Sequence, residues 1–372
     1  MIIVNEVTSK ADFKKFVKFP FQLYKDSKYW VAPIIKEELD TMDPEKNPVF
    51  KNSEAFYFLA FKDGEIVGRI AAIINWVEVK QQDKPKIRFG WFDTIDDINV
   101  TTALLDKVIE IGQSNNLKSI EGPVGFSNLD KAGLLTFGFD ELNTMVTWYN
   151  YAYYKDHFEQ LGYEKAAEWV EFQLKVPMGA PPKVEKFTHI IMKRYNLKSL
   201  YFKSIKQVLP YVDEMFALLN ETYSSLQTFV PIQQYQIDHY KKKYVNYINP
   251  EFVVGISDEN DKLIAFAITM PSFSKALKKA NGSLFPFGFY HLLKAKKKNS
   301  VAAFYLIGID TEYQNKGVTA VIFQKMQDLF NKRGITEVET NPELEENKAI
   351  QQLWKNYDHE LHKRRRTYRK DL

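Results

Sequence analysis

Residues 305 to 330 combine residue types that could bind a phosphate group. They read YLIGIDTEYQNKGVTAVIFQKMQDLF, an apolar run that turns through one glycine and then resumes at helical spacing. A strand that feeds directly into a helix leaves the first N–H groups of that helix unpaired, and such a site attracts phosphate. Glycine is also common in ordinary turns, so the stretch is either a pyrophosphate cradle or a simple strand-to-helix turn.

The composition excludes several other chemistries. The chain has no cysteine, which rules out disulfides, zinc–thiolate sites and cysteine nucleophiles. Its six histidines lack the spacing of a metal motif, so we expect no metal. The start MIIVNEVTSK does not resemble a secretory signal, and no apolar run approaches the roughly 18 residues that span a bilayer. We therefore expect a soluble cytoplasmic protein.

An internal repeat predicts the elements that position the glycine turn. The strand MIIVNEV is followed by VTSKADFKKFV, and 196 residues later the strand LKSLYF is followed in the same way by FKSIKQVLPYV. Matching hairpins are predicted in FYFLAFKDGEIVGRIAAIIN and EFVVGISDENDKLIAFAITM. The far ends also match, HFEQLGYEKAAEWVEFQL against LWKNYDHELHKRRRTYRK. Two copies of one β/α unit explain this pattern, and 372 residues suffice for about two domains.

The two copies differ by insertions and are joined at VPMGAPPKV. The first copy carries an extra segment around GPVGFSNLDKAGLLTFGFDELNTM, and the second carries a lysine-rich segment after its hairpin. We predict a first domain over residues 1–177, a linker and connecting helix over 178–196, and a second domain over 197–372. Prolines break the pattern at the join, and the connecting helix should present one apolar face made of Val184, Phe187, Ile190, Ile191 and Tyr195.

The order of elements and the glycine turn resemble the GNAT acyltransferase superfamily, the GCN5-related N-acetyltransferases. This resemblance implies an α/β (α+β) fold with two GNAT-like units in tandem, each a mixed twisted sheet flanked by helices. The family's pyrophosphate loop is Arg or Gln, two residues, Gly, one residue, then Gly or Ala. The residues that fill it here, with Ala320 directly after them, are Gln314, Asn315, Lys316, Gly317, Val318 and Thr319. Thr319 departs from the small sixth residue.

By this resemblance the loop binds acyl-CoA. Its backbone amides would hold the pyrophosphate of coenzyme A, and Gly317 would keep side-chain bulk away from the phosphates. The preceding strand would splay from its neighbour and accept the pantetheine arm through backbone groups near Ile309.

The later stretch VETNPELEENKAIQQLW resembles the second motif of the family. Asn347 matches the motif's Asn, Ile350 takes its small apolar position, and Trp354 stands where a Tyr would protonate the leaving thiolate. An indole cannot act as that acid, so the group that protonates the thiolate is unassigned, and water could serve. We take the nearby Tyr357 as a catalytic candidate.

The corresponding turn of the first copy is FDTIDDINVTTALL, which has no glycine. It places Asp93, Asp96 and Asp97 near the helix start, where we expect them to act as caps and to repel a pyrophosphate. We therefore expect a catalytically silent first unit and a cofactor-binding second unit.

Acyl transfer to an amine requires a general base, because the amine must lose a proton. The carboxylates near the expected splayed strands are Asp310, Glu312, Glu337 and Glu339, and each could equally be a surface or capping residue. Glu337 and Glu339 share one face of the strand EVET by alternation, so we take them as the catalytic candidates. Two histidines, His291 in the lysine-rich insertion and His359, are further candidates.

Two clusters of basic residues could meet anionic partners or simply be solvated. One is the C-terminus, HKRRRTYRKDL, and the other is residues 272–300, which contain seven lysines and no acid. Within the latter, GSLFPFGFYHLLKAKKKN resembles a segment of a group of bacterial tandem GNAT-like proteins that includes the ceramide synthases. An apolar strip bordered by lysines suits peripheral contact with the inner, anionic face of a membrane, although it could instead roof the core.

Three functions are compatible with the sequence. The first is an acyl-CoA-dependent N-acyltransferase acting on an amine, with a long-chain lipid amine as the sharper version. The second is a Fem-type transferase that uses aminoacyl-tRNA, although we do not expect nucleic acid as a partner. The third is a non-catalytic binding protein that kept the fold.

Overall fold

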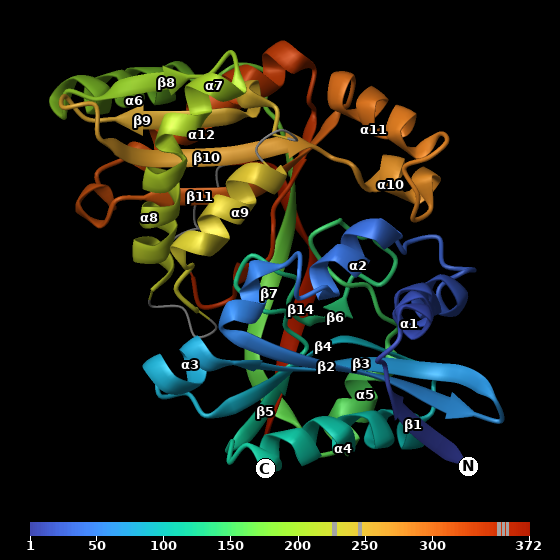
Figure 1. The fold of residues 1–372 in the computed structure, drawn as a ribbon. Helices are drawn as coiled ribbons and strands as arrows, with labels where there is room; N and C mark the ends of the chain where they lie inside the picture. Colours follow the sequence, from blue (N-terminus) through green and yellow to red (C-terminus); the bar gives the residue numbers. More distant parts are fainter. Residues whose placement is uncertain (225–228, 245–247, 348–350, 352–353, 355–356) are drawn as a thin grey trace.

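The computed structural model describes residues 1–224, 229–244, 248–347, 351, 354 and 357–372. One continuous mixed sheet runs through both halves of the chain (Figure 1). Its strand order is β1-β2-β3-β4-β5-β14-β7-β12-β11-β10-β9-β8, with β6 paired to β14 and β13 paired to β7. The strands are β1 (Ile2–Glu6), β2 (Ser53–Lys62), β3 (Glu65–Asn75), β4 (Lys86–Thr94), β5 (Ser119–Gly122), β6 (Leu134–Phe137), β7 (Glu164–Lys175), β8 (Lys198–Tyr201), β9 (Val253–Ser257), β10 (Leu263–Pro271), β11 (Val301–Ile309), β12 (Glu337–Glu339), β13 (Glu343–Leu344) and β14 (His359–Asp371).

Helices cover both faces of this sheet in each half. In the first half, α4 and α5 pack on one face and α1 and α2 on the other. In the second half, α6 and α12 cover one face and α8 covers the other. The α-helices are α1 (Lys10–Leu23), α2 (Ile35–Met42), α3 (Trp76–Gln81), α4 (Ile98–Ser114), α5 (Tyr153–Gln160), α6 (Pro182–Arg194), α7 (Ile205–Val208), α8 (Val212–Tyr223), α9 (Gln234–Tyr244), α10 (Ser274–Ala280), α11 (Gly288–Lys297) and α12 (Val318–Arg333). Short 3₁₀ turns are η1 (Pro48–Lys51), η2 (Leu209–Tyr211), η3 (Pro250–Phe252) and η4 (Thr311–Tyr313).

The repeat seen in the sequence is confirmed by the order of elements. Each half runs strand, helix, hairpin, strand, helix, strand, and ends in a long strand. The hairpins are β2–β3 and β9–β10, where alternating apolar residues face the two helical layers. The predicted α/β class is therefore correct, and both insertions lie where the sequence places them, between β5 and α5 and between β10 and β11.

The last strand of each half lies in the part of the sheet formed by the other half. β7, from the first half, pairs with β12, while β14, from the second half, pairs with β5. β7 and β14 pair with each other from Leu174–His359 to Glu164–Arg369. The domain boundaries predicted at residues 177 and 197 stay a prediction, but the sheet itself is shared around this central pair of strands (Figure 1).

The connecting helix differs from its prediction in what it buries. α6 begins at Pro182, inside the predicted linker, but of the expected apolar face only Ile191 is fully buried. Phe187 and Ile190 remain 46% and 50% exposed. The reason is that α6 packs on α12 through Ile191 and the adjacent Thr188, whose hydroxyl donates a hydrogen bond to Gln324.

Candidate functional site

Two parallel strands of the second half separate along their length. β11 and β12 pair from Val301 and Glu337 only as far as Ala303 and Glu339, although β11 continues to Ile309. From Ala303 to Ile309 a strand advances roughly 20 Å at about 3.3 Å per residue. The structure thus has a splayed opening beside β11, with Glu339 at its closed end and the glycine turn at its open end.

The edge of β11 that faces this opening accepts hydrogen bonds from side chains. The bonds join Asn341 Nδ2 to the Tyr305 carbonyl at 2.9 Å, the Tyr223 hydroxyl to the Ile307 carbonyl at 3.2 Å, and Gln314 Nε2 to the Ile309 carbonyl at 3.3 Å. A strand edge bonded by side chains can exchange them for another donor without breaking a backbone ladder. This edge therefore suits a ligand with amide groups.

At the open end, Gly317 is the N-cap of α12 and no side chain caps the helix. Its φ is 84°, a conformation that glycine adopts at no steric cost. A Cβ at this position would meet Phe187 at 2.9 Å and Ile191 at 3.1 Å. Within this structure, the glycine is therefore required by its backbone and by the approach of α6. The predicted reason, space for phosphates, is a separate matter and stays a prediction.

The other predicted loop residues surround the start of α12. Asn315 has a positive φ of 62°, and the Lys316 ammonium lies 4.9 Å from the Tyr313 ring centroid. Val318 is buried, while Thr319 and Ala320 occupy the first turn of α12, partly accessible. The first N–H groups of a helix lack intrahelical partners, so this loop retains the capacity to bind an anion.

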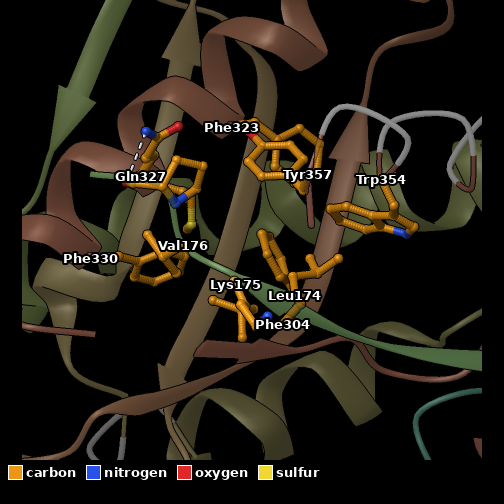
Figure 2. A pocket seen from close by; sticks show the side chains of 12 residues that line it. Leu174, Lys175, Val176, Phe304, Phe323, Gln327, Phe330, Trp354 and Tyr357 are labelled. Carbon is orange, nitrogen blue, oxygen red and sulfur yellow. Dashed lines mark hydrogen bonds between the residues drawn. The ribbon is translucent and has the colours of Figure 1, made fainter. Parts of the chain in front are cut away.

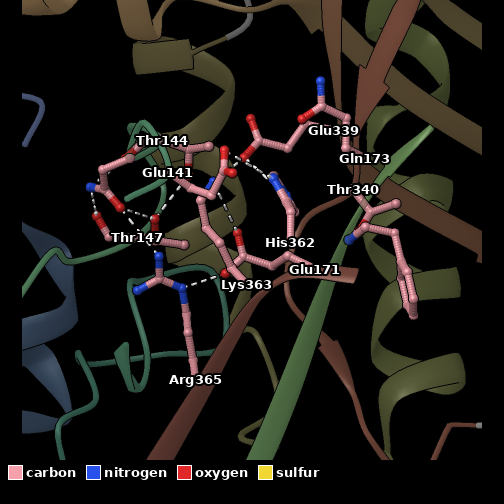
Figure 3. A network of polar contacts seen from close by, with 12 residues as sticks. Glu141, Thr144, Thr147, Glu171, Gln173, Glu339, Thr340, His362, Lys363 and Arg365 are labelled. Carbon is pink, nitrogen blue, oxygen red and sulfur yellow. Dashed lines mark hydrogen bonds and ion pairs between the residues drawn. The ribbon is translucent and has the colours of Figure 1, made fainter. Parts of the chain in front are cut away.

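At the closed end, Glu339 belongs to a buried cluster of charged residues in the centre of the sheet (Figure 3). The Lys363 ammonium forms a short ion pair with Glu339, and the Arg365 guanidinium donates to the carboxylate of Glu171. His362 Nε2 lies 3.5 Å from Glu339 Oε1. Because β14 and β12 come from the same half and β7 from the other, both halves build this cluster.

Burial and charge shift the pKa values of this cluster. Burial raises the pKa of Glu339, although Lys363 opposes that shift. Burial raises the pKa of the Tyr305 hydroxyl, and the carboxylate of Glu339 raises it further. Burial, with Lys363 and Arg365 beside it, lowers the pKa of His362 to about 3. Near neutral pH the site therefore contains a neutral imidazole and a carboxylate that accepts a proton more readily than an exposed one.

Three ligand atoms of this cluster lie close enough to hold a metal ion. The oxygens of Glu171 and Glu339 and a nitrogen of His362 are within 4.8 Å of one another. However, Lys363 and Arg365 already balance both carboxylates, so a cation would have to displace these partners. This donor set does not suit a resident metal.

Of the remaining catalytic candidates, Glu337 lies beside the cluster and the two histidines lie apart from it. Glu337 shares the face of Glu339, as predicted, and accepts a hydrogen bond from Gln173 at 3.0 Å. His291 lies on α11, where its ring contacts only the neighbouring Tyr290 among the contacts of the described residues. His359 starts β14 as an exposed residue beside Phe172. The structure therefore brings Glu337 and Glu339 together and leaves both histidines outside.

Tyr357 lies on the opposite face of the sheet. It lines a small apolar cavity of about 20 Å³ together with Trp354, Phe323 and Val338 (Figure 2). Val338 alternates with Glu337 and Glu339, so the cavity is on the far side of β12 from the charged cluster. Burial raises the pKa of Tyr357. The cavity has room for about one water molecule, too little for an acyl chain as it stands.

Glu343 is a half-buried carboxyl beside the opening that the sequence did not single out. It lies on β13, and Trp354 Nε1 donates to both of its oxygens, at 3.1 and 3.0 Å. Burial raises its pKa to about 8. The expected thiolate acid is thus absent at Trp354, but that tryptophan holds a carboxyl that is protonated at neutral pH.

The rest of the second motif is only partly described. The N–H of Asn347 donates to the Leu344 carbonyl at 2.9 Å, in the turn after β13. Ile350 lies outside the described residues. The role predicted for Asn347 at the cofactor stays a prediction.

The aspartates of the first half have separate roles, and only one is the expected cap. Asp97 is the N-cap of α4 and accepts from the N–H of Asn99 at 3.0 Å. Asp93 is instead buried in an ion pair with Arg69 at 2.7 Å, and Asp96 lies 3.3 Å from His157. Asp93 lies within β4, one residue before its end, and its carboxylate is buried in the core. The prediction of three caps was wrong for Asp93 and Asp96.

Most of the C-terminal basic cluster lies within the central strand rather than on the surface, and only Arg369 and Lys370 are exposed. Lys363 and Arg365 are fully buried, while Arg364 and Arg366 pair with Glu168. The sequence interpretation, which offered a solvated face or an anionic partner, was wrong because these charges meet carboxylates that are distant along the chain. His362 was missed for the same reason; the period-two alternation of a strand through HELHKRRRTYRK was the signal that could have found it.

Comparison with known proteins agrees with this architecture. No family model matches the chain. It is 28% identical over 377 residues to Protein YghO of Escherichia coli strain K12, covering 100% of this chain and 95% of that protein. It is 24% identical to the bacterial ceramide synthase of Caulobacter vibrioides strain NA1000 / CB15N, covering 99% and 97%. Among solved structures, a tandem GNAT protein from the clavulanic acid biosynthesis pathway matches at a TM-score of 0.57 and 9% identity, covering 100% of this chain and 98% of that one. The chain therefore has the tandem GNAT fold that its sequence predicts.

Proposed function

We propose that this protein transfers an acyl group from acyl-CoA to an amine, and that the amine is a long-chain lipid. The observation that carries the proposal is the splayed opening, which runs from an uncapped helix start to a buried carboxylate. The GNAT fold of the whole chain supports the assignment as an acyltransferase.

Acyl-CoA would lie along the opening. Its pyrophosphate would meet the N–H groups at the start of α12, and Lys316 would supply a positive charge beside it. The amides of the pantetheine arm would replace the side chains of Asn341, Tyr223 and Gln314 on the edge of β11. The thioester would then approach Glu339 at the closed end.

Glu339 would act as the general base for the amine. Its carboxylate is at the point where β11 and β12 separate, and burial makes it a better proton acceptor. The neutral amine would attack the thioester carbonyl, and the coenzyme A thiolate would leave. Glu343, protonated at neutral pH, would return a proton to that thiolate in place of the missing tyrosine.

The lysine-rich insertion supports a lipid acceptor. Its aromatic side chains do not roof the core: Phe285 and Phe287 are 78% and 72% exposed, and Phe289, Tyr290 and Leu293 are exposed beside them. Lysines flank this strip on α10 and α11, which project from the sheet in Figure 1. Such a surface fits an anionic membrane, where aromatic groups enter the interface and ammonium groups meet headgroups. No helix among the described residues is long and apolar enough to cross a bilayer.

The ceramide synthase relative also supports a lipid amine, since its name describes a lipid product. The Fem-type alternative is weakened, because Lys363 and Arg365 of the C-terminal cluster are buried and Arg364 and Arg366 pair with Glu168. We therefore do not develop it further.

Titration with coenzyme A in a calorimeter, followed by mass spectrometry of products, tests the proposal. We expect one coenzyme A bound per chain, and N-acylated product from a long-chain amine supplied in anionic vesicles. A stoichiometry of two would assign a site to the first half, and equal use of short soluble amines would remove the lipid from the proposal. Absence of binding would favour a non-catalytic role.

A further inference from the structure

His362 is a buried side chain whose ring has no hydrogen-bonding partner. It is 6% exposed, and neither Nδ1 nor Nε2 is hydrogen-bonded within the part of the chain that the structure describes. It lies where the pairing of β14 with β7 shifts register, between Leu361 and Lys363. A neutral imidazole offers one donor and one acceptor, and a buried donor or acceptor without a partner is unfavourable. The two ring nitrogens are therefore available to exchange a proton or to bind a polar group.

The two ring nitrogens face two carboxyls at different depths. Nε2 lies 3.5 Å from Glu339 Oε1, and Nδ1 lies 3.8 Å from Glu141 Oε2. The Glu339 side chain is 12% exposed and that of Glu141 is 41% exposed. Figure 3 shows His362 between them. Both distances are too long for a direct hydrogen bond, but a small rotation or one bridging water closes each.

Burial and the surrounding positive charges keep the imidazole neutral. Burial lowers the pKa of His362, and Lys363 and Arg365 lower it further. Glu171, on the neighbouring strand β7, accepts a hydrogen bond from Arg365. Burial raises the pKa of Glu141 and of Glu339. A neutral ring can accept a proton at one nitrogen while it releases the proton on the other. It therefore joins two carboxyls without storing a buried positive charge.

We propose that Glu339, His362 and Glu141 form a path that carries the proton of the acceptor amine to solvent. The proposal rests on the proposed function and deepens it. Glu339 takes the proton from the amine and passes it to Nε2. The proton on Nδ1 then moves to Glu141, which releases it to water. The ring is left protonated on Nε2, and a flip of the ring about its Cβ–Cγ bond restores the first tautomer. At the end of the cycle both carboxylates are ionised again and the imidazole is neutral.

This path gives the first half of the chain a role in the reaction. Glu141 belongs to the insertion between β5 and α5, whereas Glu339 and His362 come from the second half. The same insertion holds Arg365 in place, because the guanidinium donates to the carbonyl of Trp148 and to Asn143 at 3.2 Å. Both ends of the path are thus fixed by contacts between the halves.

The test compares Glu141→Gln and His362→Gln with the wild type in the full chain, using a long-chain amine and acyl-CoA. We expect turnover to fall at least about tenfold in each variant, with coenzyme A affinity unchanged. The solvent deuterium isotope effect on turnover should rise. Added imidazole should restore turnover in Glu141→Gln in proportion to its basic form. Asp140→Asn, an exposed neighbour in the same insertion, is the matched control and should keep wild-type turnover.

The outcomes separate this proposal from the proposed function. If the wild type transfers no acyl group, the proposed function fails. If the wild type is active and Glu141→Gln has its turnover and isotope effect, the path is overturned even when His362→Gln is slow. If His362→Gln does not fold, Glu141→Gln decides alone, because Glu141 is partly exposed and its replacement leaves the core intact.

Discussion

Each half of the molecule contains one pair of parallel strands that separate along their length. The two openings differ in whether backbone or side chains form hydrogen bonds to the exposed strand edge. In the first half, β4 and β5 pair as far as Arg88 and Glu121, and β4 continues to Thr94. The chain that follows β5 fills this opening, since the N–H of Val124 donates to the Phe89 carbonyl at 2.8 Å. A Cβ at Gly90 would lie only 2.7 Å from the Val124 carbonyl oxygen, which leaves no space for a ligand.

In the second opening, side chains rather than backbone form hydrogen bonds to the strand edge, so a ligand could replace them. The edge of β11 accepts from Asn341, Tyr223 and Gln314, and the following helix has no side-chain cap. In the first half, the equivalent helix is capped by Asp97. One duplicated geometry is therefore structural where backbone and a capping carboxylate occupy it, and keeps the capacity to bind a ligand where replaceable side chains do.

The largest expected effect concerns the carboxylate at the closed end of each opening. Glu339 and Glu121 occupy equivalent last positions of their ladders. Glu339→Gln should lower acyl transfer by roughly 100- to 10,000-fold, because it removes the general base, while coenzyme A binding is retained. The measurement is a single-turnover rate.

Glu121→Gln is the control for that experiment. Glu121 pairs with Lys86 at 2.9 Å, and Lys86 keeps a second partner in Glu78 at 3.1 Å. We expect a lower melting temperature but an unchanged rate per folded molecule. An equal loss of rate in both variants would show that the two carboxylates do not differ in function.

The next effect concerns the start of α12, where an introduced aspartate would imitate the capped start of α4 in the first half. Thr319→Asp places a carboxylate in the first turn of α12, where it stabilises the helix but repels a pyrophosphate. We expect coenzyme A affinity to fall by about tenfold or more, with an unchanged or higher melting temperature. Calorimetry measures the affinity, and Thr319→Asn is the neutral control.

Gly317→Val is a less specific version of this test. A Cβ there would meet Phe187 and Ile191, so a loss of binding could come from displacement of α6. If Thr319→Asp binds coenzyme A as the wild type does, the uncapped helix start is not the pyrophosphate site.

A smaller effect is expected on the exposed aromatic strip, which only the second half carries. Phe287→Asp combined with Phe289→Asp should weaken sedimentation with anionic vesicles several-fold, because two aromatic groups no longer enter the interface. High salt should release part of the wild-type protein as well. Tyr201→Asp, which changes an exposed aromatic residue on β8, is the control. Wild-type protein that ignores anionic vesicles at low salt would exclude the membrane contact.

The sequence predicted the repeated order of elements because each element is encoded locally. Alternation marks the hairpins, and the glycine with the following apolar run marks the start of α12. The pairing of β7 and β14 with strands of the opposite half was not predictable in this way, because the alternation within a strand does not determine which strand it pairs with. The same limit hid the buried ion pairs, as Lys363 and Glu171 look like surface residues until the sheet brings them together.

In the candidate site, too, features encoded within one element were predictable and contacts between distant residues were not. Glu337 and Glu339 share a face because alternation within one strand fixes it. Tyr357 was named as a catalytic candidate for its place near Trp354 in the chain, and it lines the cavity on the other face of the sheet. Glu343 and His362 depend on contacts with Trp354 and Glu141, which no local pattern contains.

The smallest expected effect is on the pH dependence of stability, and it also distinguishes the two openings. The first opening balances its carboxylates with Lys86 and Arg88, whereas Glu343 in the second has no cation in contact among the described residues. Its pKa rises from 4.5 to about 8 on folding. The folded protein then holds a proton that the unfolded chain has released, so stability from this group is full below pH 4.5 and is lost as pH rises through 8.

Replacing the Glu343 carboxyl by an amide should remove the part of the pH dependence of stability that comes from this group. Glu343→Gln keeps an acceptor for Trp354 Nε1 but cannot ionise. Across pH 5 to 8 the melting temperature of the wild type should therefore fall by a few degrees relative to the variant, and below pH 5 the two should converge. Shifts at Glu339 and His362 occur in both proteins and cancel in the difference. Parallel melting curves across this range would mean that Glu343 is ionised in the folded protein, and the proposed acid for the thiolate would be lost with it.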